Sequence, residues 1–139
     1  MVSITLREGD IFLSKDLSTC GGDPHFHIVI HKTTGNQIVV VYTTKEVDKT
    51  RAICQRNEGI KFPHIDPDTL VILDHTHSDS FTMPSAIDCG KAILKPESYF
   101  SSQQYFKVTA PLKNIATLGV IKRGIKASDL IGDVLKRLL

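Results

Sequence analysis

The chain has 139 residues and a mass of 15.4 kDa, which is enough for one domain with a real core and too little for two. Hydrophobic residues make up 41% of it and charged residues 23%, as in ordinary globular proteins, so wholesale disorder is excluded. The N-terminal segment carries Glu8 and Asp10 and has no long apolar run. We therefore expect no signal peptide, and no stretch approaches the roughly 20 apolar residues of a membrane span.

Charge and cysteine usage bear on partners and compartment. Residues 1–106 hold 10 basic and 13 acidic side chains, net −3, whereas residues 107–139 hold 7 basic and 2 acidic ones, net +5. The basic end favours either an acidic partner, nucleic acid or protein, or a solvated helix face.

Cys20, Cys54 and Cys89 form no CxxC pair, so we expect structural thiols in a reducing compartment, the cytoplasm. A catalytic Cys–His pair is the alternative, without a local signature.

The first strands are predicted by apolar runs between turn residues. Residues 9–14 (GDIFLS) predict a short strand, and the loop at 15–24 that follows contains two adjacent glycines and an Asp-Pro step. HFHIVIH at 25–31 and QIVVVYTT at 37–44 are rich in β-branched residues and are separated by Gly35-Asn36. This pattern predicts a β-hairpin.

Side chains alternate along the first strand of this hairpin. The pattern places Phe26, Ile28 and Ile30 on one face, and His25, His27, Val29 and His31 on the other. We expect the apolar face to be buried. Without a functional role, His27 is expected to face solvent, and His31 is expected to be exposed at the end of the strand.

The middle of the chain predicts a loop and two further strands. Residues 45–69 are polar and contain two prolines, so we expect a loop with at most a short strand around 52–54. TLVILD at 69–74 predicts a buried strand, and SAIDCGKAIL at 85–94 predicts another that bends at Gly90.

The C-terminal part changes to a helical period. Pro111 suits the first turn of a helix whose face contains Leu112, Ile115 and Ala116. Ser128 is expected to cap a last helix packed on the strands. Its apolar stripe would comprise Leu130, Ile131, Val134, Leu135 and Leu138.

Strands first and helices last predict a mainly β fold. We expect a single domain over 1–139, with an antiparallel, partly closed barrel over about 1–106 and C-terminal helices over about 109–139.

Several short motifs occur in the order found in one family. They are Gly9-Asp10-Ile11, the GGDP loop at 21–24, HFHIVI at 25–30 and IVVVYTT at 38–44. In this order they resemble the MazF/PemK/Kid toxins over about residues 9–95. FPHIDPDT and MPSAIDCGKAIL also resemble a divergent, PemK-like branch of that family.

The resemblance implies an SH3-like barrel that commonly forms a homodimer. It implies a toxin with endoribonuclease activity that cleaves single-stranded RNA without a metal or other cofactor. An antitoxin protein is then an expected partner, and no membrane is involved.

The resemblance also implies site residues. The family relies on an arginine just before the second strand and on a threonine that ends the third. His25 stands at the arginine position here, and Thr43 or Thr44 matches the threonine. A histidine can act as base or acid near neutral pH, so His25 is the expected catalytic group, with His27 as a second proton-transfer group.

Basic residues after the third strand are candidates for RNA binding. Lys45, Arg51 and Arg56 follow the threonines. The two arginines would supply the guanidinium that is missing at position 25, or they belong to a solvated loop.

A metal site is a competing hypothesis. In VILDHTHSDS, the residues His75, His77 and Asp79 have the spacing of the HxHxD stretch of metallo-β-lactamase hydrolases, and such side chains bind zinc. Ser80 stands where that motif has a further histidine, and too few residues follow for the rest of that fold. We therefore expect no metal there.

A non-catalytic SH3-like module that binds protein or nucleic acid is the third hypothesis.

Overall fold

The computed structural model describes residues 5–15, 23–103 and 105–139. Antiparallel pairing joins seven strands in the order β4-β5-β3-β2-β1-β7, and β6 pairs with β3 outside this path. The strands are β1 (Ile11–Ser14), β2 (His25–Lys32), β3 (Gln37–Thr44), β4 (Leu70–Leu73), β5 (Ser85–Asp88), β6 (Ile93–Pro96) and β7 (Phe106–Thr109).

The fold is mainly β, as predicted, but the sheet stays open. β4 and β7 lie at its two ends and do not pair with each other in the described residues. The predicted closure into a barrel is therefore not present in this structure.

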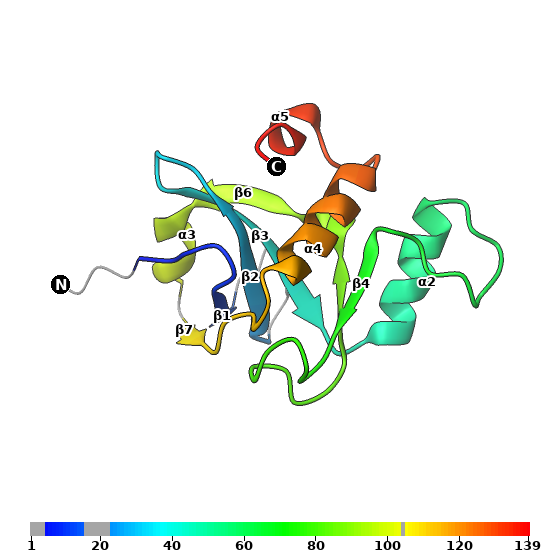
Figure 1. The fold of residues 1–139 in the computed structure, drawn as a ribbon, viewed down its shortest axis with the longest axis horizontal. Coiled ribbons are helices and arrows are strands. Elements are labelled where there is room, and N and C mark those ends of the chain that lie inside the picture. Colours follow the sequence, from blue (N-terminus) through cyan, green and yellow to red (C-terminus); the bar gives the residue numbers. More distant parts are fainter. Residues whose placement is uncertain (1–4, 16–22, 104) are drawn as a thin grey trace.

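The predicted hairpin is formed by β2 and β3, at the centre of the fold (Figure 1). Its turn closes with a hydrogen bond from the Thr33 N–H to the Gln37 carbonyl at 2.9 Å. Asn36 takes a positive φ of 59°, a conformation that asparagine tolerates better than most residues. The register shifts between Val29 and His31, so a bulge interrupts the strict alternation near the end of β2.

The single bent strand predicted at 85–94 is divided in two: β5 and β6 form on either side of a turn that contains Gly90. β5 pairs with the last two residues of β3, and β6 pairs with its first four. Between them lies the three-residue 3₁₀ turn η1 (Cys89–Lys91), so one edge of β3 is covered by two short strands and a break. The Gly90 N–H donates to Asp88 Oδ1 at 3.0 Å and stabilises this turn.

Four helices complete the described fold. They are α2 (Val47–Asn57), α3 (Glu97–Ser101), α4 (Ala116–Ala127) and α5 (Asp133–Lys136). The prediction of a loop at 45–69 is wrong for α2. The sequence of α2 is mostly polar, and its buried residues are Thr50 and Cys54. Cys54 packs against Leu70 and Ala86 of the sheet. Tertiary packing therefore outweighs the weak helical signal.

The C-terminal helices differ from the predicted ones. Residues 109–115 are not helical: Thr109 ends β7, and α4 begins at Ala116. Ser128 is the residue that ends α4, and its Oγ accepts the Leu130 N–H at 3.1 Å. The predicted stripe is consequently divided between a turn and the short α5, where Val134 is 74% exposed.

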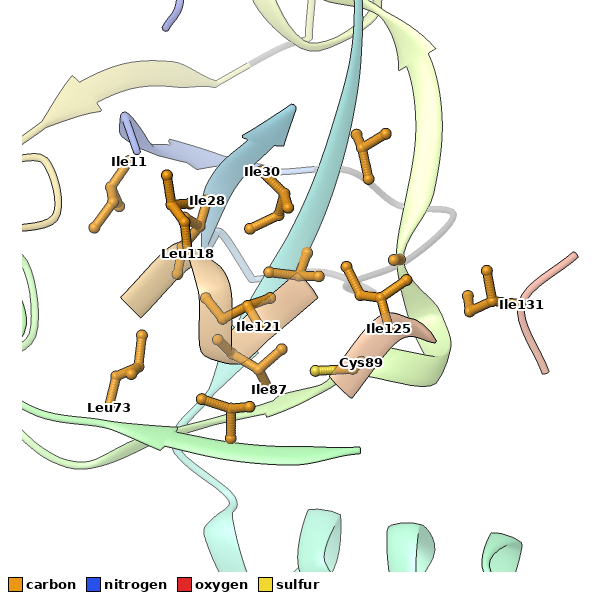
Figure 2. Close-up of a cluster of buried hydrophobic side chains, with 14 of the residues drawn as sticks. Ile11, Ile28, Ile30, Leu73, Ile87, Cys89, Leu118, Ile121, Ile125 and Ile131 are labelled. Atoms are coloured by element: carbon orange, nitrogen blue, oxygen red, sulfur yellow. The ribbon is translucent and has the colours of Figure 1, made fainter. Parts of the chain in front are cut away.

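Both faces of the hairpin are buried. On one face, α4 crosses the sheet (Figure 1), and its apolar side is directed at the strands (Figure 2). This cluster includes Ile28, Ile30, Val39, Val41, Ile87, Leu118, Ile121 and Ile125. The opposite face packs in a second cluster that includes Leu6, Phe12, Val29, Ile38, Val40 and Phe100.

None of the helices in the described part of the chain is long and apolar enough to cross a lipid bilayer.

The packing of α4 leaves no room for a side chain at Gly124. A Cβ at this position would lie 2.6 Å from Cys89 Sγ and 2.7 Å from the Asp68 carbonyl oxygen, whereas one at Gly119 would meet nothing closer than 4.0 Å. We expect Gly124→Ala to lower the free energy of unfolding by roughly 1–3 kcal/mol through overpacking. Gly119→Ala, on the same helix, should raise it by up to about 1 kcal/mol. Urea unfolding followed by circular dichroism measures both, and equal effects would contradict this packing.

Candidate functional site

A cavity of about 810 Å³ lies where β2 begins, β3 ends and α2 begins. The strands contribute His25, Tyr42, Thr43 and Thr44 to its wall, next to apolar Leu13 and Phe26. Polar side chains gather here because both faces of the hairpin are buried in its middle, and the cavity lies at the end opposite the turn.

His25 is held in a defined orientation. Its Nδ1 lies 2.7 Å from the Thr43 carbonyl oxygen. Because a carbonyl only accepts hydrogen bonds, Nδ1 carries the hydrogen, and in the neutral ring the lone pair is on Nε2. The ring meets Tyr42 edge-on, with centroids 5.7 Å apart and planes at 89°. His25 therefore presents a basic nitrogen from a fixed ring.

The two threonines contribute in different ways. The Thr43 side chain is buried, and this residue reaches His25 through its backbone carbonyl. Thr44 is half-buried, and its Oγ1 accepts the Glu46 N–H at 3.2 Å. A hydroxyl that accepts in this way keeps its own O–H for donation. Thr44 is thus the threonine whose side chain suits contact with a ligand.

His27 does not line the cavity, and the expectation that it faces solvent is wrong. It is 1% exposed and stacks flat on Phe12, with centroids 5.1 Å apart and planes at 8°. Phe100 also covers it, at 5.6 Å. Its Nδ1–H donates to the His25 carbonyl at 2.9 Å. His27 therefore supports the backbone of His25 from within the second cluster.

His31 was expected to be exposed, but the structure shows it half-buried. Its Nδ1 lies 3.0 Å from Glu8 Oε1.

Three lysines line the cavity. Lys45 precedes α2, Lys49 lies in its first turn, and Lys91 belongs to η1. Two acidic side chains, Asp23 and Glu46, share the wall, and Glu46 lies 3.6 Å from Lys49. The described wall thus contains three lysines against two carboxylates.

The predicted arginines do not line the cavity. Arg51 binds Asp66 at 2.7 Å and Asp48 at 3.0 Å, and the hydrogen bond with Asp66 raises the pKa of its guanidinium. Arg56 is exposed in the last turn of α2. Of the three predicted RNA-binding residues, only Lys45 is in the wall.

The lining residues that sequence reasoning missed include Lys49, Tyr42 and Lys91. Lys49 lies in the first turn of α2, so a correct prediction of this helix would have placed it near Lys45 and the end of β3. Tyr42 directly precedes the threonines. Lys91 has no local signal, because its position depends on the break between β5 and β6.

Two of the three candidate metal ligands in the DHTHSDS loop already have other partners. His77 Nδ1 accepts the Asp74 N–H at 3.0 Å, and Asp79 pairs with Lys113 at 3.0 Å. Hydrogen bonds from Thr76 lower the pKa of Asp74. The part of the chain that the structure describes contains no group of three His, Cys, Asp or Glu side chains able to hold a metal.

The described cysteines lack the properties of nucleophiles. Cys54 and Cys89 are buried, and burial raises the pKa of each thiol from 9.0 to about 12. Reactive cysteines instead have a lowered pKa and some exposure. Cys20 and the glycines of the 15–24 loop lie outside the described residues.

No known protein family matches this chain, and neither does any curated protein sequence.

We expect the DHTHSDS loop to bind no zinc, because Asp79 and His77 are already paired. Protein dialysed after incubation with zinc should retain less than about 0.1 equivalent by elemental analysis, since the usual four ligands are not assembled. His77→Ala should give the same value. One equivalent that survives dialysis and disappears in His77→Ala would establish a metal site.

We expect Cys54 and Cys89 to resist alkylation in the folded protein. At pH 8, a thiol with a pKa of about 12 is thiolate about a thousandfold less often than one at 9.0. Iodoacetamide labelling followed by peptide mass spectrometry should therefore modify neither residue natively and both in denaturant. Rapid native labelling of either cysteine would show that its surroundings open.

Proposed function

We propose that this protein is a metal-independent endoribonuclease of the MazF/PemK type that cleaves single-stranded RNA in the cavity. On this proposal its strands form an SH3-like fold. The observation that supports this most is the meeting of His25, Thr43, Thr44 and Lys45 in one wall. These residues come from β2, from β3 and from the segment between β3 and α2. On this proposal the protein works in the cytoplasm, and an antitoxin protein and a second copy of the chain are its expected partners.

The arrangement supports general-base chemistry. His25 Nε2 takes the proton of a ribose 2′-hydroxyl while Nδ1–H stays bound to the Thr43 carbonyl. The 2′ oxygen forms a bond to phosphorus, and the bond from phosphorus to the 5′ oxygen breaks. The leaving 5′ oxygen takes a proton from solvent water, and His25 later releases its proton to solvent. The products are a 2′,3′-cyclic phosphate and a 5′-hydroxyl.

The cavity also offers groups that stabilise the negative charge on the reacting phosphate. The Lys45 and Lys49 ammonium groups lie in the same wall, and the Thr44 hydroxyl retains a hydrogen to donate. Donors that are already oriented toward developing charge lower the barrier most effectively. Single-stranded RNA fits such a site because its backbone and bases can be splayed apart.

A non-catalytic RNA-binding module is the second candidate. It is favoured by one observation: no arginine lies in the described cavity wall, and lysines beside an aromatic ring suffice to bind RNA without cutting it.

The experiment that tests the proposal is cleavage of a generic single-stranded RNA by purified protein in EDTA. We expect the parent to cut and His25→Ala to cut about 10²–10⁴-fold more slowly, the usual contribution of a proton-transferring histidine. RNA affinity should change little, because a histidine that acts as a general base does so in its uncharged form.

His64→Ala is the matched control, since His64 is exposed and outside the cavity wall. It should cut like the parent, and both variants should unfold at the parent's urea concentration. Equal rates for His25→Ala and the parent would refute the role of His25. A parent that binds RNA but cuts nothing would favour the binding module.

A further inference from the structure

Lys91 and Tyr42 meet inside the cavity although they are 49 positions apart. The Lys91 Nζ lies 3.4 Å from the Tyr42 hydroxyl oxygen. The Tyr42 ring in turn contacts the His25 ring. An ammonium group, a phenol and the candidate base thus follow one another along the wall.

The break in the strand beside β3 places Lys91 there. The pairing of β3 with β5 ends at Ile87 and its pairing with β6 begins at Ile93, and the turn η1 lies between these two pairs instead of a continuous strand. Without this insertion, the strand would continue its ladder along β3. The Asp88 side chain accepts the Gly90 N–H and holds the turn.

The end of α4 fixes the other side of η1. A Cβ at Gly90 would lie 3.0 Å from Ser128 Oγ and 3.2 Å from Leu130, and Gly124 packs directly on Cys89. The backbone before Lys91 is therefore enclosed by the C-terminal part of the chain. Lys91 itself is exposed, so its ammonium group reaches solvent at the cavity.

No described carboxylate forms an ion pair with Lys91, in contrast to Lys49 and Lys113. Its contact with Tyr42 uses one of three N–H donors. The Tyr42 oxygen accepts that bond and keeps its O–H hydrogen for donation. Donors from both side chains remain for a ligand that only accepts.

We propose that Lys91 and Tyr42 form a subsite for a phosphate group of the RNA backbone. The assignment rests on the proposed function for the identity of the ligand. Phosphate oxygens accept several hydrogen bonds and carry the charge that an ammonium group attracts. The contact with His25 through Tyr42 places this subsite beside the candidate base.

Salt-dependent binding of a fluorescent single-stranded RNA tests the subsite without requiring cleavage. We expect Lys91→Met to raise Kd by about 3–10-fold and to reduce the slope of log Kd against log salt by about 0.7, the value for one phosphate contact on a single strand. Tyr42→Phe keeps the ring and should raise Kd while leaving the slope unchanged.

Lys95→Met is the matched control. Lys95 carries the same charge four positions further on, but it lies over the Tyr99 ring, 5.1 Å from its centroid, and outside the cavity wall. Its loss should leave the slope within error of the parent. Equal slope changes in Lys91→Met and Lys95→Met would overturn the subsite, because only net charge would then matter.

A second measurement covers the case in which the parent binds no RNA, which would refute the proposed function. Inorganic phosphate should then shift the NMR signals of Tyr42 and Lys91 in a saturable way, and Lys91→Met should abolish the Tyr42 shift. Acetate at the same ionic strength should have little effect. No shift with phosphate, or the same shift with acetate, would overturn the subsite itself.

Discussion

Burial of both faces of the β2–β3 hairpin constrains the rest of the molecule. α4 covers the face with Ile28 and Ile30, and Phe12 and Phe100 cover the face with Val29. Each fully buried apolar side chain contributes about 1.5–3 kcal/mol, so these two layers hold the sheet together although it does not close into a barrel. Polar groups within the hairpin must then be hydrogen-bonded or lie at its ends.

The candidate site is a consequence of this constraint. His25 and Thr44 lie at the end of the hairpin where burial stops, and the cavity opens there. The buried His27 connects the second cluster to the site, because its Nδ1–H binds the His25 carbonyl while its ring stacks on Phe12. A rigid core beneath the site keeps the His25 ring in one orientation, which proton transfer requires.

The other side of the site depends on the first cluster. α4 packs its apolar side on the sheet and, at its C-terminal end, presses Gly124 against Cys89 of η1. The same helix that completes the core thus sets the position of the turn that carries Lys91. The C-terminal segment and the cavity are physically linked through this contact, although their sequences are far apart.

The sequence by itself determined the elements whose signals are local. The alternation in 25–31 predicted the two faces of β2 as far as the bulge between Val29 and His31, and the Gly35-Asn36 turn and the bend at Gly90 predicted where the chain changes direction, because strand period and turn chemistry depend on near neighbours. It also pointed to His25 and the threonines as a group. The helix α2 was not predicted because its sequence is mostly polar. Only two of its residues are buried, and their burial is favourable only when the sheet is present. The burial of His27, the open sheet and the position of Lys91 were decided by tertiary structure, since each depends on contacts between segments that no local pattern encodes.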